Sequence, residues 1–317
     1  MSIMDVTILF IFVWLFFTKS RPATGFDRVS TGTLRGIAML LIILHHIHIR
    51  INDGSLMLES AGYLATGLFF FISGYGNQLS LTKKEESFRW LINKFIKIYR
   101  TYLVGFVLYW FILKLLYKEI ALTAFSTVKH LLIMSMPNQV TWFPKMILLS
   151  FAIHWVLNKY FRKHTASFFW IIDIIILGMM VYGKVRSFWW FSFLCYPTGV
   201  LFAEKKDMFR DKPLLKFFVF GLVCTITALT GVYREPARII AAMTLSICCY
   251  YLTEIYHFES KQLEYVGNNS FEFYIFHVLC LQTFAMLIGV NALLYGTSVI
   301  LGSIALVHIY LKIKNSI

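Results

Sequence analysis

The sequence predicts an all-α protein, a polytopic bundle of about ten or eleven transmembrane helices. Of its 317 residues, 58% are hydrophobic and only 15% are charged, whereas soluble domains are nearer to half apolar and a quarter charged. The mean hydropathy is +0.69. The apolar residues form stretches long enough to cross a bilayer. Within these stretches apolar and polar residues do not alternate as they do in the strands of an outer-membrane barrel. We therefore expect an integral membrane protein.

Hydrophobic stretches of spanning length follow one another along the chain, with no soluble domain between them. We expect a single integral membrane domain over residues 1–317, with a core at about 30–311 and an extra amino-terminal span within 1–18. That first stretch lacks the basic region and cleavage site of a signal peptide. Segment 128–137 is too short to span and is a candidate re-entrant segment. The expected spans lie at roughly 4–18, 33–50, 61–80, 101–117, 141–158, 166–182, 187–203, 214–232, 238–256, 269–289 and 291–311.

Lysines and arginines indicate the orientation, because they concentrate on the cytoplasmic side of membrane proteins. With the amino terminus outside, most of the 30 basic residues fall on the inner side. Arg35 then lies at the cytoplasmic end of the second span, and His46 lies toward the outside. The formal net charge of +14 comes from residues that flank apolar segments. This distribution favours the lipid bilayer as a partner and argues against nucleic acid.

The five cysteines all fall inside expected spans. They show neither the spacing of metal ligands nor that of a disulfide framework. We therefore expect buried free thiols that act as small hydrophobic side chains, and no bound metal.

The most informative residues are Arg35 and His46, which are separated by ten residues in an apolar stretch. On a helix they lie about 20° apart around the axis and roughly 16 Å apart along it. His45 and His48 lie on other faces. Ionisable groups at such depth are costly and are usually functional. A neutral imidazole can accept a hydroxyl proton; the alternative is a set of histidines that pack near a helix end.

Two further segments have both a chemical and a structural interpretation. Ser73, Gly74 and Tyr75 follow a run of apolar residues and indicate either a cavity wall or close helix packing. Ser73 lacks the strand–turn–helix context of a nucleophile elbow. The basic residues Lys94, Lys97 and Arg100 are the strongest cytoplasmic candidates for binding phosphates. They are also typical of a basic anchor on anionic lipid.

Aromatic and polar residues near two other spans are candidate substrate contacts. Trp142 opens a span on the outer side, where an aromatic side chain can stack on a sugar ring or belong to the interfacial belt. Ser270, Tyr274 and His277 fall within about 60° of one another on a helix. Such a stripe is typical of a cavity wall or of ordinary hydrogen bonds between helices.

Together these motifs resemble the membrane-bound acyltransferase family 3, in order from about residue 30 to 310. Each motif alone is weak, but five in sequence are specific. The chain departs from the family pattern where lysines replace the usual arginines and Arg100 replaces the usual proline. We also expect no carboxy-terminal SGNH hydrolase-like domain. The matching residues are Arg35 and His46, then Phe69, Phe70, Phe71, Ile72, Ser73, Gly74 and Tyr75, then Lys94, Lys97, Ile98 and Tyr99, then Trp142 and Phe143, and finally Ser270, Tyr274, Ile275 and His277.

The resemblance implies acyl transfer, usually of acetyl, from cytoplasmic acyl-CoA to a hydroxyl of an extracytoplasmic polysaccharide or lipid-linked saccharide. It also implies a bacterial inner or plasma membrane. Acetyl-CoA is then a donor substrate, and no bound cofactor is expected. By the same resemblance, Arg35, Lys94, Lys97 and Arg100 contact the donor. His46 is the general base, or a transient acyl carrier, and Ser73 with Gly74 helps to form the cavity.

A transporter or flippase for a lipid-linked saccharide is the main alternative. It explains the many spans and the charges within the membrane, but not the pairing of Arg35 with His46, and no transporter repeat is visible. A glycan polymerase is expected to have large outer loops, and the loops here are short. A structural scaffold gives no reason for the histidine cluster.

Overall fold

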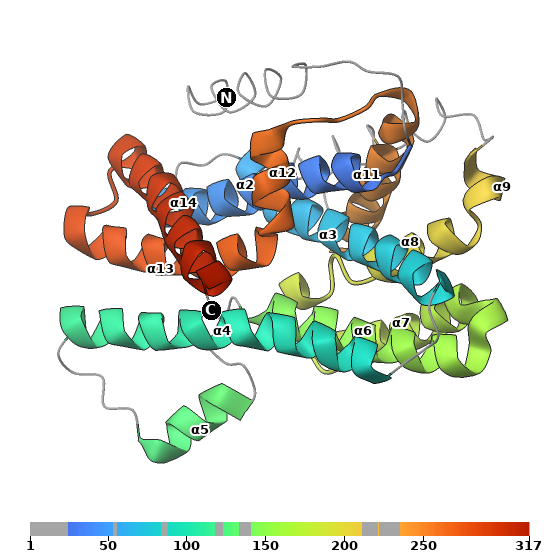
Figure 1. Ribbon diagram of the computed structural model, residues 1–317, viewed down its shortest axis with the longest axis horizontal. Helices are drawn as coiled ribbons and strands as arrows, with labels where there is room; N and C mark the ends of the chain where they lie inside the picture. Colours follow the sequence, from blue (N-terminus) through green and yellow to red (C-terminus); the bar gives the residue numbers. More distant parts are fainter. Residues whose placement is uncertain are drawn as a thin grey trace. The chain divides into compact units, whose positions relative to one another are not determined.

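The computed structural model describes residues 25–52, 56–83, 88–117, 123–132, 141–210, 221 and 235–316 (Figure 1). These residues are mainly helical and contain no β-strand, which confirms the predicted fold class. The helices are α2 (Arg28–Ile51), α3 (Leu56–Lys83), α4 (Phe88–Tyr117), α5 (Ala124–Leu132), α6 (Trp142–Phe161), α7 (Thr165–Tyr182), α8 (Cys195–Glu204), α9 (Lys206–Arg210), α11 (Glu235–Ile255), α12 (Lys261–Asn268), α13 (Ser270–Ile288) and α14 (Ala292–Ser316), with 3-10 turns at Arg162–His164 and Ser187–Trp189.

Six helical stretches among the described residues are long and apolar enough to cross a membrane. Together they cover seven of the expected spans, because one stretch runs through both α6 and α7. The helix α3 has 28 residues and contains the expected span at 61–80, but it is not among these six stretches. The expected spans at 4–18 and 214–232 lie outside the described residues, apart from residue 221. The six stretches are Arg28–Ile51, Phe88–Ile112, Trp142–Tyr182, Glu235–Glu254, Ser270–Ile288 and Leu293–Ser316.

The expected span at 187–203 is not one continuous helix. Its first part forms a 3-10 turn at Ser187–Trp189 and further turns up to Leu194, in which the Ser187 carbonyl accepts from two following backbone amides. Only α8 is α-helical, with 10 residues, which is half the length of a single spanning helix. Most apolar side chains of this segment are buried against other helices, and burial in protein produces the same hydropathy signal as contact with lipid.

Two other segments belong to helices. The basic stretch before the fourth expected span belongs to the continuous helix α4. The part of the candidate re-entrant segment that the structure describes belongs to the short helix α5, and residues 133–137 lie outside the described part.

Contacts between residues divide the chain into two compact units. The first comprises Met1–Glu86 with Ile153–Asn268, and the second comprises Ser87–Ala152 with Asn269–Ile317. The helix α6 contributes to both. The expectation of a single membrane domain stays a prediction.

The first unit is built around α3, which contacts α2, α8 and α11 (Figure 1). Glycines bring the backbones of α3 and α8 together. A methyl group on Gly74 would overlap the Tyr196 carbonyl oxygen, and one on Gly199 would overlap the Phe71 carbonyl oxygen. Small residues allow helices to approach this closely in lipid, so the glycine of the Ser73-Gly74 motif has a packing role.

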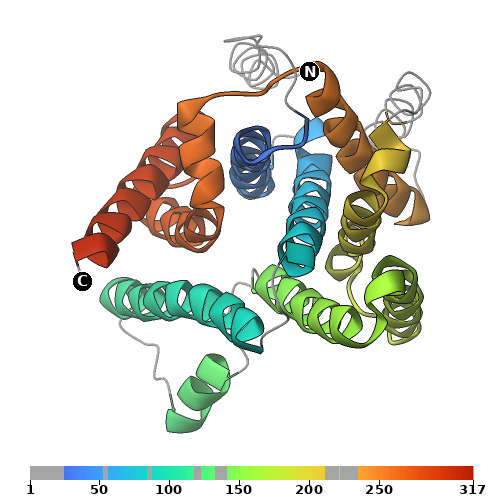
Figure 2. The same ribbon diagram turned by 45° about the vertical axis from the view of Figure 1, so that its right-hand side comes forward.

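The short helix α12 lies along α2 in the same unit (Figure 2). A methyl group on Gly36 would overlap the carbonyl oxygen of Leu263, and one on Gly267 would overlap that of Gly32. Two glycines of α2 and one of α12 therefore bring these helices into direct backbone contact.

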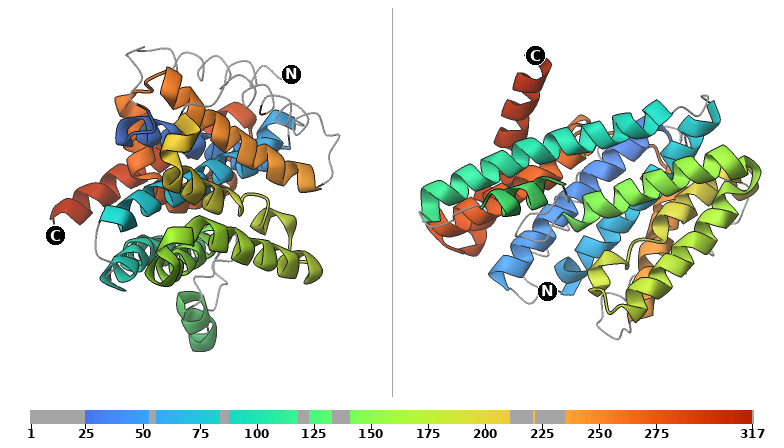
Figure 3. Two further views of the ribbon diagram at one scale, coloured as in Figure 1. Left: turned by 90° about the vertical axis from the view of Figure 1, so that its right-hand side faces the viewer. Right: turned by 90° about the horizontal axis from the view of Figure 1, so that it is seen from below.

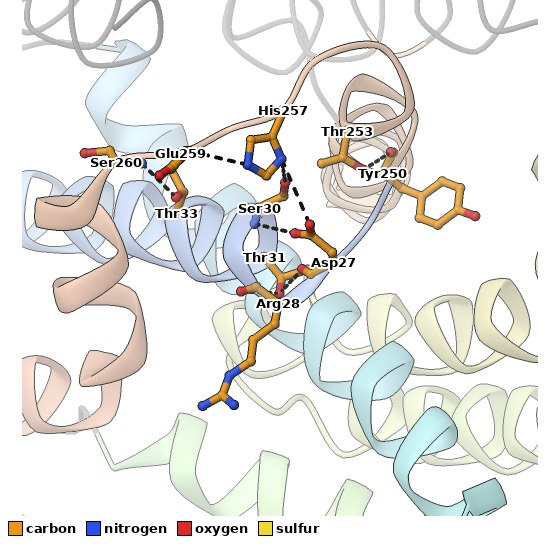
Figure 4. A network of polar contacts seen from close by, with 10 residues as sticks. All are labelled: Asp27, Arg28, Ser30, Thr31, Thr33, Tyr250, Thr253, His257, Glu259 and Ser260. Atoms are coloured by element: carbon orange, nitrogen blue, oxygen red, sulfur yellow. Dashed lines mark hydrogen bonds and ion pairs between the residues drawn. The ribbon is translucent and has the colours of Figure 1, made fainter. Parts of the chain in front are cut away.

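Polar residues connect the start of α2 to the segment before α12 (Figure 4). Asp27 caps α2 by accepting from the Ser30 backbone amide at 2.7 Å. The His257 ring lies above this turn, with Nδ1 at 4.0 Å from Asp27 and Nε2 at 3.7 Å from Glu259. These contacts hold the amino-terminal end of α2 in place.

In the second unit, α13 packs against α4 and α14 (Figures 1 and 3). The buried carboxylate of Glu272 on α13 accepts from Lys314 Nζ on α14 at 3.2 Å. The partial exposure of Lys314 lets the pair form without burying both charges completely.

Candidate functional site

The helix α2 carries Arg35 and His46 without interruption. Both side chains are half-buried. Because the helix is continuous between them, their predicted separation of roughly 16 Å along one face applies to the folded chain. The His46 ring lies next to that of His45, with centroids 5.1 Å apart. The helix therefore places a cation and an imidazole on one face, roughly 16 Å apart along its axis.

Arg35 is positioned by the carboxyl end of α12. One terminal nitrogen donates to Asn268 Oδ1 at 3.2 Å, and Nε donates to the Thr31 carbonyl at 3.3 Å. Asn268 in turn donates to the Glu264 carboxylate at 3.4 Å. Sequence reasoning missed Asn268; the only local signal was its place in the glycine-asparagine-asparagine segment before α13.

His45 serves the packing of α2 against α3. Its Nδ1 donates to the Leu58 carbonyl at 2.8 Å, so the proton lies on Nδ1 in the neutral ring. The ring occupies the space that the missing side chain of Gly62 leaves open. His48, on another face of α2, is buried. The three neighbouring histidines therefore have different environments.

The Ser73-Gly74-Tyr75 motif lies in the middle of α3. Gly74 is in contact with α8, as described above. The Tyr75 ring packs edge to face on Phe26 at 4.9 Å and tilted on Tyr250 at 5.8 Å between centroids. Ser73 is half-buried. Gly74 and Tyr75 therefore have packing roles.

In the second unit, the three basic residues of α4 have different surroundings. Lys94 Nζ lies 5.4 Å from the ring centroids of both Trp90 and Phe151, so its charge is held by aromatic faces. Lys97 and Arg100 are exposed. The two exposed cations are better placed than Lys94 to meet phosphates.

A row of aromatic rings joins two of the sequence motifs in the same unit. Trp142 packs on Phe143, and Phe143 lies 5.3 Å from Tyr274 between centroids. Tyr274 in turn lies 5.8 Å from His277, whose Nδ1 donates to the Phe273 carbonyl at 3.0 Å. His277 is fully buried. Two motifs more than a hundred residues apart in the sequence thus form one cluster.

The predicted site residues are divided between the two units. Ser270 begins α13 and is half-buried. Within the described part of the chain, no three His, Cys, Asp or Glu residues are grouped so that they could hold a metal ion, and the expectation of no metal stays a prediction. The first unit contains Arg35, His46, Ser73, Gly74 and Tyr75; the second contains Lys94, Lys97, Arg100, Trp142, Ser270, Tyr274 and His277.

Sequence reasoning also missed a buried polar network in the first unit. His154, fully buried, contacts the Tyr196 hydroxyl with Nδ1 at 3.0 Å and Gln78 Oε1 with Nε2 at 2.7 Å. Because Gln78 Oε1 only accepts, Nε2 is the donor in that contact. Asn77 donates to the same hydroxyl at 3.0 Å. This network connects α6, α3 and α8, and an isolated histidine within an apolar span was its only sequence signal.

The fold and these residues define a class of protein: a helical multi-pass membrane protein with ionisable groups inside its bundle. A model of the acyltransferase 3 family, described as an acyltransferase domain, matches residues 31–311. The chain belongs to this family. No curated protein and no solved structure matches the chain. The protein is thus a multi-pass membrane acyltransferase.

Proposed function

We propose that the protein transfers an acyl group, acetyl in the expected case, from cytoplasmic acyl-CoA to a hydroxyl of an extracytoplasmic saccharide. The acceptor is a polysaccharide of the cell envelope, such as a capsule, or a lipid-linked saccharide, in a bacterial inner or plasma membrane. Family membership supports the acyl transfer. The other parts of the proposal, the acyl-CoA donor and the saccharide acceptor, are supported by the placement of Arg35 and His46 on one face of the continuous helix α2.

The proposed chemistry uses His46 as a general base. Its neutral imidazole takes the proton of the acceptor hydroxyl, and the oxygen attacks the thioester carbonyl carbon. The new C–O bond forms, the C–S bond breaks, and the imidazolium returns the proton to the departing thiolate. A variant of this scheme, in which His46 carries the acyl group transiently, would give a two-step reaction.

In the proposed reaction, cationic side chains bind the acyl-CoA donor. Arg35 carries a permanent charge and donates in a planar array, which suits the carbonyls of the donor near the thioester. Lys97 and Arg100 are exposed and suit the phosphates of coenzyme A. Ser73, half-buried on α3, is a candidate donor to the oxyanion.

The test supplies labelled acetyl-CoA to the cytoplasmic face of membrane vesicles and measures labelled ester on the glycan. We expect ester with wild type and with Arg50→Ala, and a large loss with Arg35→Ala, because Arg50 is exposed at the other end of α2. Unlabelled saccharide that crosses the membrane while no ester forms would instead support a flippase.

Loss of the Asn268 side chain should weaken the reaction without removing a reacting group. Asn268→Ala is expected to lower transfer by about tenfold and to raise KM for acyl-CoA, because a hydrogen bond to a charged group contributes about 1.5–3 kcal/mol. Asn268→Asp keeps an accepting oxygen and should retain more activity. Steady-state kinetics with labelled acetyl-CoA measures both variants; equal losses in the two would contradict the positioning role.

A further inference from the structure

The first unit contains a cavity of about 500 Å³. It lies between the ends of α2, α3 and α11 and the turns that follow α7. Its size is within the range of roughly 300–1,000 Å³ that is typical of small-molecule sites. It is lined by His45, His48, Ile49, Asn52, Glu59, Tyr63, Phe188, Phe191 and Arg238.

Four separate segments contribute to this cavity, and the charge distribution assigns all of them to the same side of the membrane. The second span ends near residue 50 and the third begins near 61, the sixth is followed by the turns at 187–194, and the ninth begins near 238. All four positions are expected on the outer side. The structure brings them together in one unit, which agrees with an outward-facing site.

A positioned cation forms one wall of the cavity. The guanidinium carbon of Arg238 lies 5.1 Å from the centroid of the Phe191 ring and 5.9 Å from that of Tyr63. The two rings themselves are 5.7 Å apart. Contact with aromatic faces orients a planar guanidinium, so its donors are held in a defined direction.

The other walls provide further polar groups and an aromatic face. Glu59 is exposed and offers a carboxylate, and Asn52 is exposed and offers an amide. The Phe188 ring also lines the space. Ile49 is the single aliphatic side chain in the lining.

Such a combination matches the chemistry of a sugar. Hydroxyl groups both donate and accept, so they pair with carboxylate, amide and guanidinium groups, while the C–H face of a pyranose packs on an aromatic ring. The cavity also borders the proposed base, since His45 lines it and the His45 and His46 rings are 5.1 Å apart.

We propose that this cavity binds the saccharide unit of the acceptor, with Arg238, Glu59 and Phe188 as its specificity-determining contacts. The inference rests on the proposed function and assigns the acceptor to a particular place. A saccharide held here has its hydroxyls next to the histidines at the outer end of α2.

The test measures ester on the native surface polysaccharide and the binding of acetyl-CoA to the purified full-length protein. We expect Arg238→Ala and Phe188→Ala to lower ester content at least tenfold, chiefly through a higher KM for the acceptor, with acetyl-CoA binding unchanged. Arg50→Ala and Phe168→Ala, outside the lining, are matched controls. Glu59→Gln, at an exposed position, serves as a second variant if Arg238→Ala fails to fold, and it should also raise KM for the acceptor.

The outcomes separate the two proposals. Ester formation by the pocket variants at the wild-type rate would overturn the acceptor site and leave the proposed function intact. A wild-type protein that forms no ester would overturn the proposed function itself. A phospholipid that copurifies with wild type and is lost from Arg238→Ala, while ester content is unchanged, would assign the cavity to a lipid headgroup.

Discussion

His46→Ala is expected to lower acyl transfer at least about a hundredfold, because general base catalysis typically contributes 10²–10⁴-fold. The ring shares the half-buried face of α2 with Arg35, and its removal leaves no base at that depth on this face. The measurement is the ester content of surface polysaccharide by NMR, at matched expression of wild type and variant.

His45 provides the matched control for this experiment. His45→Asn keeps a nitrogen that can donate to the Leu58 carbonyl, as His45 Nδ1 does at 2.8 Å, but it removes Nε2. This variant should lose far less transfer than His46→Ala, since His45 lines the proposed acceptor cavity but is neither the proposed base nor one of the specificity-determining contacts. His45→Ala should behave in the same way, with lower stability. Loss of ester in His45→Asn together with its retention in His46→Ala would identify His45, and not His46, as the general base.

Gly36→Ala is expected to destabilise the folded protein by at least roughly 3 kcal/mol, the upper range for overpacking a well-packed core. The added methyl group overlaps the Leu263 carbonyl oxygen, so α2 and α12 must separate. Separation also breaks the contact between Arg35 and Asn268. The midpoint of thermal unfolding of the purified protein reports the stability, and the ester assay reports the effect on the site.

Gly76→Ala makes the same chemical change where a methyl group meets nothing within 4 Å. Alanine is about 1 kcal/mol more favourable than glycine inside a helix, so this variant should be neutral or more stable. The two substitutions are thus predicted to have opposite signs. A similar unfolding midpoint for both would contradict the close contact between α2 and α12.

Helix positions were largely predictable, because hydropathy is a property of neighbouring residues. The expected span at 269–289 corresponds to α13 at Ser270–Ile288, and that at 33–50 lies within α2 at Arg28–Ile51. The segment 187–203 departs from a continuous helix for a specific reason: its aromatic residues fold into turns that pack mostly against other helices, yet it is as apolar as a helical span. Hydropathy does not distinguish burial in protein from burial in lipid.

The candidate site was predictable only where its residues share one helix. Helical geometry relates Arg35 to His46 from their spacing alone. The partner of Arg35 is Asn268, which is 233 positions away in the sequence, and no local pattern indicates it. The same holds for Arg238, whose guanidinium contacts rings from α3 and from the turns after α7.

The sequence by itself determined that this is a helical membrane protein, that it resembles one acyltransferase family, and that Arg35 and His46 lie on one face of a helix. These properties depend on composition, local periodicity and motif spacing. The tertiary structure alone decided that Gly36 and Gly74 bring backbones into contact, that Asn268 orients Arg35, and that four distant segments line one cavity. Packing between helices depends on which surfaces meet in space, and the local sequence of a helix does not indicate which helix it will pack against.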